Sequence, residues 1–181
     1  MFRQVGDRAG QARALHNLGV ISQAQGRHQK AIRFYRQALA IYRETGDPLG
    51  EASTLLHLGR TQERQGRYDL AARYNGQALA IAAEIGAPQI ECAALIDLGS
   101  VGFRQGEYRQ AAGHLHQALA MCRETGFRGA EAEALTRIGD LCLGQGRPDE
   151  AAGHLREALS LYREIRILDG EADALNSLGE V

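Results

Sequence analysis

The feature that most constrains this chain is a repeat of 40 residues, which runs without insertion or deletion from about residue 11 to the end. Complete copies span residues 11–50, 51–90, 91–130 and 131–170, and residues 171–181 begin a fifth copy. Five columns of the aligned copies keep one residue type: Leu15, Leu55, Leu95, Leu135 and Leu175; Gly19, Gly59, Gly99, Gly139 and Gly179; Gly26, Gly66, Gly106 and Gly146; Ala31, Ala71, Ala111 and Ala151; Ala38, Ala78, Ala118 and Ala158. A repeat of this length indicates a stacked array. Because no linker interrupts the period, we predict that residues 1–181 form one domain.

Each copy has the pattern of two helices separated by a turn. In the first copy, Ala12, Leu15 and Leu18 recur at a spacing of three, which places them on one face of a helix. Gly26 predicts the end of this helix, since glycine suits the left-handed backbone that follows a helix. A second helix is predicted over about residues 28–45, and Gly46-Asp47-Pro48 ends it. The chain is therefore predicted to be all-α, built from antiparallel helix pairs.

The columns of small residues predict where helices approach closely. We expect Gly19 and Ala31 to mark the crossing of the two helices within a copy, and Ala38 to contact the next copy. A larger side chain at such a contact would overpack it. The fourth boundary, residues 166–170, lacks the glycine found at the other boundaries. There we predict that Ile167 and Leu168 pack into the following copy and that Gly170 forms the turn.

The same columns resemble a known family. The order Ala-x-x-Leu-x-x-Leu-Gly, followed by Gly26, Ala31, Tyr35 and Ala38, resembles the tetratricopeptide repeat. Forty-residue copies with Arg-Glu-x-Gly-Asp, as in residues 43–47, are similar to Leu-Gly-Asn repeat adaptors and to the arrays of bacterial signal-transduction ATPases and transcriptional activators. The resemblance implies a right-handed superhelical solenoid. HEAT and armadillo arrays have a similar period and are the alternative, although they do not require these glycine and alanine columns. The asparagine of the adaptors is absent, because Val20, Arg60, Ser100, Asp140 and Glu180 stand at its position.

The two ends of the sequence match parts of a copy. Residues 2–7 align with residues 42–47, so residues 1–10 are predicted to end a preceding copy, and residues 171–181 to form the first helix of a truncated fifth copy. We therefore expect the chain to be a piece of a larger protein. We also expect its incomplete ends to associate end to end at high concentration, since arrays normally close with polar caps.

Composition excludes several classes of function. With 21 basic and 22 acidic residues the formal net charge is -1, which does not favour nucleic acid or an anionic membrane surface. The sequence contains neither an apolar run of about 18 residues nor an apolar signal core, so we predict a cytoplasmic protein.

No arrangement of residues predicts catalysis, a metal site or a cofactor. Cys92, Cys122 and Cys142 lack a C-x-x-C spacing and are predicted to be buried core residues. His114 and His154 occupy one column but have no third ligand beside them. We therefore predict that the chain is not an enzyme.

The candidate binding residues lie on the first helix of each copy. Positions 13, 17, 20 and 24 and their equivalents follow a spacing that places them opposite the buried leucines. In tetratricopeptide-like arrays the first helices line a concave groove, so the resemblance implies that this stripe faces the ligand. The predicted groove residues are Arg13, Asn17, His57, Arg60, Arg64, Asp97, Ser100, Arg104, Arg137 and Asp140. An apolar strip is predicted from Leu56, Ile96 and Phe103.

The charge of this stripe changes along the sequence. Counting histidine as neutral, its positions carry +1, +2, 0, -1 and -2 in the five successive copies. A polarised groove favours a peptide bound in one direction, with Arg60, Arg64 and Arg104 holding an acidic segment through bidentate hydrogen bonds. The leading prediction is a protein- or peptide-binding scaffold, a docking or sensory module of a larger regulator. The alternative is a sensor of a small ligand or signalling peptide that controls a linked effector; RNA binding is disfavoured by the neutral charge and few aromatic residues.

Overall fold

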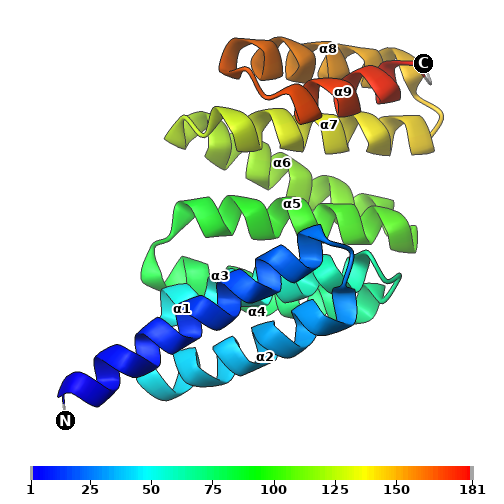
Figure 1. Ribbon diagram of the computed structural model, residues 1–181. Coiled ribbons are helices and arrows are strands. Elements are labelled where there is room, and N and C mark those ends of the chain that lie inside the picture. Colours follow the sequence, from blue (N-terminus) through cyan, green and yellow to red (C-terminus); the bar gives the residue numbers. More distant parts are fainter. Residues whose placement is uncertain (1, 180–181) are drawn as a thin grey trace. The chain divides into compact units, whose positions relative to one another are not determined.

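The computed structural model describes residues 2–179, with side chains from residue 8 onward, and these residues form nine α-helices (Figure 1). The helices are α1 (Phe2–Ala24), α2 (His28–Thr45), α3 (Pro48–Glu63), α4 (Tyr68–Ile85), α5 (Pro88–Gln105), α6 (Tyr108–Thr125), α7 (Arg128–Gly144), α8 (Pro148–Ile165) and α9 (Leu168–Leu178). The all-α prediction is confirmed, and α2 has the bounds that the sequence pattern predicted.

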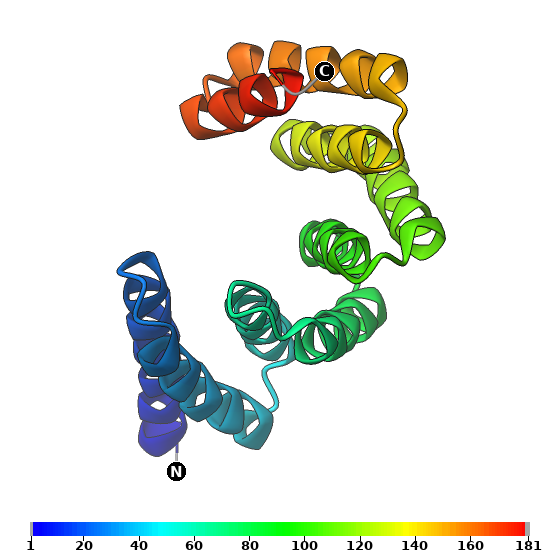
Figure 2. The same cartoon turned by 90° about the vertical axis from the view of Figure 1, so that its right-hand side faces the viewer.

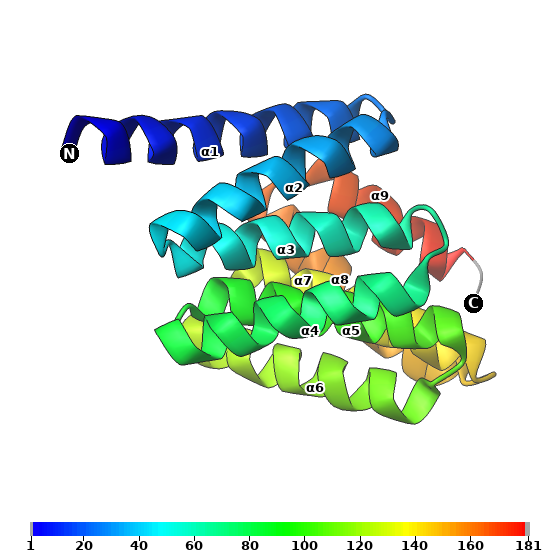
Figure 3. The ribbon, with the colours of Figure 1, turned by 90° about the horizontal axis from the view of Figure 1, so that it is seen from below.

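The chain forms two compact units, residues 1–94 and residues 95–181, which we call unit 1 and unit 2. In unit 1, α1 packs on α2, α2 on α3, and α3 on α4. In unit 2, α6 packs on α7, α7 on α8, and α9 contacts both α7 and α8. Successive helices within each unit run antiparallel, as the colour gradient shows in Figures 2 and 3. That residues 1–181 form one domain stays a prediction.

Glycine ends the helices where the sequence predicted turns. The glycines with positive φ, between 64° and 78°, are Gly26, Gly46, Gly66, Gly86, Gly106, Gly126 and Gly146. The left-handed backbone at Gly46 lets its own N–H and that of Asp47 donate to the last carbonyls of α2. The Asp47 carboxylate then accepts from the Gly50 N–H at 2.9 Å, which caps the start of α3.

The first-helix glycines lie against a side chain sixteen residues later in the second helix. A Cβ built at Gly139 would lie 2.6 Å from Leu155 Cγ, and one at Gly99 would lie 3.3 Å from the Ala111 carbonyl oxygen. Equivalent overlaps would occur between Gly19 and Tyr35, Gly59 and Asn75, and Gly99 and Leu115. The predicted close crossing at the glycine column is confirmed in every complete copy.

Ala38 packs toward the first helix of its own copy. It lies in a buried cluster with Ala12 and Tyr42, and Leu15 of α1 packs against this cluster. Ala31 and Ala38 are seven residues apart, which returns them to the same face of α2. That Ala38 also contacts the next copy stays a prediction.

Residues 2–10 also differ from the prediction. The turn that residues 6 and 7 share with Gly46-Asp47 does not form, and α1 continues as one helix from Phe2 to Ala24. Arg8 stands at the position that Pro48 occupies in the first copy and Pro88 in the second. Unlike proline, Arg8 has a backbone N–H and continues an α-helix without a steric clash.

The fourth boundary is turned by Arg166 rather than by Gly170. Arg166 adopts φ 59°, and Gly170 lies buried inside α9 beneath the ring of Tyr162. Leu168 is 77% exposed, so it does not pack into the following copy as predicted. Glycine at position 170 leaves room for the Tyr162 ring, which a Cβ would overlap. A Cβ at Gly50 would overlap the Tyr42 ring in the same way.

Three of the four boundaries between helix pairs carry an equivalent ion pair. The arginine in the last turn of the second helix binds a glutamate eight residues later: Arg43 with Glu51 at 2.7 Å, Arg123 with Glu131 at 3.1 Å, and Arg163 with Glu171 at 2.8 Å. At the remaining boundary the glutamate is kept as Glu91, whereas the arginine position holds the exposed Ala83. The α4–α5 boundary therefore lacks this interaction.

We expect Gly59→Leu to lower the free energy of unfolding by about 1–3 kcal/mol or more, because the new side chain overlaps Asn75 on α4. Thermal denaturation followed by circular dichroism measures this effect. Gly76→Leu is the matched control, since nothing lies within 4 Å of a Cβ built at Gly76. An unchanged melt for Gly59→Leu would contradict the packing.

We expect Ala83→Arg to raise the free energy of unfolding by about 0.5 kcal/mol, because the new guanidinium reaches Glu91 as Arg43 reaches Glu51. The gain should disappear when Ala83→Arg is combined with Glu91→Gln. Chemical denaturation of the four members of this cycle measures the coupling, and a zero coupling would refute the assignment.

Candidate functional site

The predicted groove residues of unit 1 occupy α1 and α3. Arg13, Asn17 and Arg64 are exposed, whereas His57 and Arg60 are partly buried. Neither the Arg13 nor the Arg64 side chain has a hydrogen bond or ion pair within the described part of the chain. These two arginines are accessible cations.

Beside them, a polar network joins three helices of unit 1. The Thr54 hydroxyl on α3 donates to the Gly50 carbonyl at 2.7 Å and therefore accepts from Nδ1–H of His16 on α1, at 3.0 Å. The hydroxyl of Tyr35, on α2, donates to Gln23 Oε1 on α1 at 2.8 Å. Thr54 and Tyr35 thus each tie α1 to a neighbouring helix.

Two histidine rings lie within this network. The ring centroids of His16 and His57 are 5.0 Å apart, and His57 stacks on Tyr35 with centroids 5.5 Å apart. Burial lowers the pKa of His57 to about 4, with the nearby charges of His16 and Arg60 adding to the effect. Burial also lowers the pKa of His16. Both imidazoles are therefore neutral at pH 7, and His57 adds no positive charge to its stripe.

We expect unit 1 to lose stability as the pH falls from about 6.5 to 4. The unfolded state protonates His57 near its ordinary pKa of 6.5, whereas the folded state holds it neutral to about 4, so protons favour unfolding across this window. The full loss for His57 is about 3 kcal/mol. Melting temperatures at pH 7.5 and 5 measure the part of this loss that is reached by pH 5, compared with His57→Gln, whose pH dependence should be shallower. Equal slopes for both proteins would contradict the burial of a neutral His57.

In unit 2, three first helices line a cavity of about 560 Å³. Its described lining residues are Phe103 and Arg104 from α5, Asp140, Leu143 and Gly144 from α7, and Ser177 from α9. Ser100 and Arg137 line a smaller cavity of about 20 Å³ with Phe103, Arg104 and Asp140. The structure thus brings four of the predicted groove residues and Phe103 together at one place.

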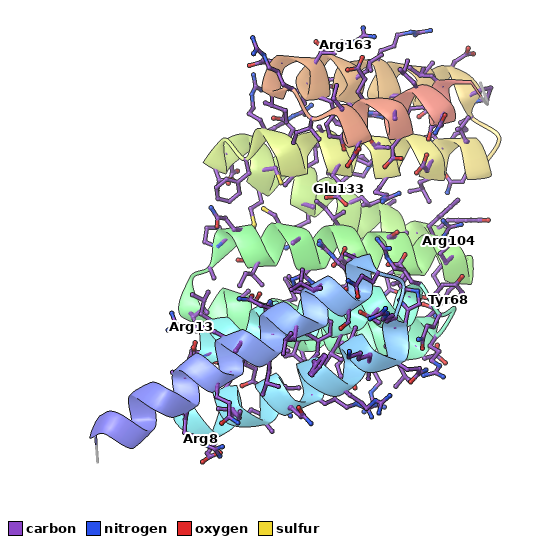
Figure 4. All side chains as sticks on the ribbon, viewed as in Figure 1. Arg8, Arg13, Tyr68, Arg104, Glu133 and Arg163 are labelled. Atoms are coloured by element: carbon purple, nitrogen blue, oxygen red, sulfur yellow. The ribbon has the colours of Figure 1, made fainter. Side chains whose placement is uncertain are left out.

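Of the charged side chains around this cavity, Asp140 and Arg137 have polar partners and Arg104 has none among the described residues. The Ser177 hydroxyl donates to Asp140 Oδ1 at 2.7 Å, and Arg137 Nη1 lies 3.6 Å from Asp140 Oδ2. The Arg104 guanidinium lies 5.9 Å from the Phe103 ring centroid and makes neither a hydrogen bond nor an ion pair with other described residues. Arg104 is exposed near the end of α5 (Figure 4). An anionic group on a ligand would find Arg104 available, while Asp140 already has partners.

The aromatic wall of the cavity depends on a glycine. A Cβ built at Gly144 would lie 2.6 Å from Phe103 Cε2, so only glycine leaves the ring in this position without a shift. On the other side the Phe103 ring meets Tyr108, with centroids 5.9 Å apart. The cavity therefore combines an aromatic face, a free cation and a hydrogen-bonded carboxylate, the mixture typical of ligand sites.

Two residues of the predicted apolar strip do not reach the surface. Leu56 is 7% exposed and Ile96 is 1% exposed, so Phe103 alone remains accessible. Leu56 lies in a core cluster with Ile32 and Leu39 of α2. A first helix is therefore covered on two sides, by its own partner and by the preceding helix, which the one-sided pattern did not anticipate. Asp97 is likewise buried.

The sequence prediction missed three residues that matter. Leu143 shares the column of Phe103, where earlier copies have Gln23 and Glu63, and this change to apolar residues was a usable signal. His16 and Thr54 carried no such signal, because a single polar residue on a mostly buried face does not reveal its partner.

No three metal-binding side chains come together among the described residues. The three cysteines form no disulfide and are buried, which confirms the prediction of core residues. None of the described helices combines the length and apolar character needed to cross a membrane.

Comparison with known proteins gives one family. The family described as "Tetratricopeptide repeat" matches residues 2–84 and 90–164. No curated protein matches the chain in sequence.

Solved structures share the fold at low identity. Aspartyl phosphate phosphatase F from Bacillus subtilis superposes with a TM-score of 0.84 at 16% identity, covering 92% of this chain and 44% of that protein. The Rap conjugation gene regulator of the plasmid pLS20, in complex with the Phr* peptide, gives 0.80 at 18%, covering 92% and 46%. A STAND protein with a tetratricopeptide repeat sensor from Pyrococcus horikoshii gives 0.79 at 17%, covering 94% and 27%. The chain thus spans less than half the length of each of these proteins.

Proposed function

Because the chain belongs to the tetratricopeptide repeat family, we propose that it binds a peptide or protein segment along the exposed faces of its first helices. It would act as a docking or sensory module of a larger cytoplasmic regulator. The observation that carries the proposal is the cavity of unit 2, in which the unpaired Arg104 stands beside the accessible ring of Phe103. A charged fork next to an apolar face suits a carboxylate that is flanked by an apolar side chain.

The solved relatives support a ligand-binding role. One Rap regulator holds a Phr* peptide, and the array of the STAND protein is called a sensor. Because the identities are below 20%, the likeness supports the fold, and the ligand must be sought through the residues of this chain.

A small-ligand sensor is the second candidate, since about 560 Å³ lies within the usual range of cavities for small molecules. We do not propose catalysis by analogy with the phosphatase, which is 16% identical. The carboxylate of the cavity, Asp140, is held by Ser177 and Arg137 and lacks the isolation that tunes a catalytic acid or base.

The experiment is a peptide-display selection on the wild-type chain, followed by affinity measurements of the enriched peptides on Arg104→Glu. We expect binding at least tenfold weaker, because charge reversal turns an attraction into a repulsion at the cavity. Arg156→Glu is the matched control, an exposed arginine of α8 outside the cavity.

Circular dichroism must first show that both variants are folded. Peptides that bind the two variants equally well would place the site elsewhere. A folded wild-type chain that enriches no peptide would refute peptide binding and leave the small-ligand candidate.

A further inference from the structure

The first helices of unit 2 differ in how their exposed charges are neutralised. On α7, Arg137 lies 4.0 Å from Glu133 and 3.6 Å from Asp140, so the one cation of this stripe is shared by two carboxylates and the stripe keeps a net charge of -1. On α5, Arg104 has no ion pair with a described residue, and on α9 the exposed Asp173 has none either. Unit 2 therefore presents a free cation on α5 and a free anion on α9, on either side of a helix whose own cation is already paired.

Asp173 is on the ligand-facing side of α9. It precedes Ser177 by four residues, which places both on one face of the helix. Ser177 lines the cavity and donates to Asp140 on α7. Glu133, at the equivalent position of α7, lies on the corresponding face of that helix (Figure 4).

The separation of the two free charges follows from helix geometry. Helix α7 contacts α9 and lines one cavity together with α5. At the spacing of about 8–10 Å between neighbouring helices, α5 and α9 are about 18 Å apart. Arg104 stands 11 residues further along the repeat than Asp173, whose equivalent is Ala93. At 1.5 Å per residue this adds about 16 Å along the axis. The resulting diagonal of about 24 Å corresponds to roughly seven residues of extended peptide.

Building on the proposed function, we infer that unit 2 selects peptides carrying one acidic and one basic side chain about seven residues apart. The acidic side chain binds Arg104, the residue beside it packs on Phe103 and Leu143, and the basic side chain binds Asp173. A peptide that is acidic throughout gains at Arg104 but meets repulsion at Asp173. The ligand is therefore a peptide of mixed charge, which carries a basic side chain in addition to the acidic one that the sequence predicted.

The test uses three pools of synthetic decapeptides that differ at two positions seven residues apart. The pools carry Glu and Arg, Glu and Glu, or Arg and Arg, with the intervening residues varied among apolar and small types. The wild-type chain should bind the Glu/Arg pool at least tenfold more tightly than either other pool.

Charge-reversal variants then assign each contact. Arg104→Glu leaves two anions and should prefer the Arg/Arg pool, whereas Asp173→Arg leaves two cations and should prefer the Glu/Glu pool. The controls Arg156→Glu and Glu124→Arg make the same charge changes at exposed residues of α8 and α6 and should keep the wild-type preference. A gain of binding to a new pool is not expected from a merely structural effect.

The outcomes separate this inference from the proposed function. If the wild-type chain binds the three pools equally, or if the variants keep the wild-type preference, the mixed-charge inference is wrong while peptide binding stands. If the folded wild-type chain binds none of the pools, and display selection also yields no peptide, the proposed function fails with it.

Discussion

The contact on which the rest of the structure depends is the one between a first-helix glycine and the side chain sixteen residues later. The missing Cβ at Gly19, Gly59, Gly99 and Gly139 is the space that this side chain occupies. With the helix axes fixed in this way, the buried leucines point inward and the opposite face of the first helix is left for solvent or a ligand. The partner varies from Tyr35 to Asn75 to leucine, so the glycine is the constant part of the contact. Asn75 is fully buried and neither atom of its amide has a partner among the described residues, which is a cost that the leucines at the same position avoid.

A second pair of positions shows how the copies compensate for size. Tyr42 and Tyr162 each fill the space above a glycine, Gly50 and Gly170. In the two middle copies the aromatic residue is replaced by Ala82 or Cys122, and the glycine by the larger Ile90 or Ala130. The total volume is thereby roughly kept, as dense packing requires. Gly170 is therefore a packing residue. The left-handed turn before α9 is formed by Arg166 instead.

The sequence could predict the features that recur in each copy, but not the contacts that a residue makes in one copy alone. The alternation of helices, the turn glycine within each copy and the crossing at Gly19 occur in every complete copy, so the period made them visible. The networks of His16 and Thr54, and of Ser177 and Asp140, each occur once and depend on a second helix that no spacing identifies. Burial of Leu56 and Ile96 was missed for a related reason, since the pattern of one helix does not tell how many neighbours cover it.

The same distinction governs the electrostatics. Summing formal charges along the stripe treats every charged residue as available to a ligand, yet Arg137 is held by Glu133 and Asp140. Burial also keeps His57 neutral. Among the described residues of the stripe of unit 2, Arg104 and Asp173 are the exposed charged side chains without an ion pair. Two opposite charges at fixed positions of packed helices would specify both the charges of a ligand and their spacing, which a gradient of net charge cannot do. Recognition by such an array therefore depends on the charges that packing leaves unpaired.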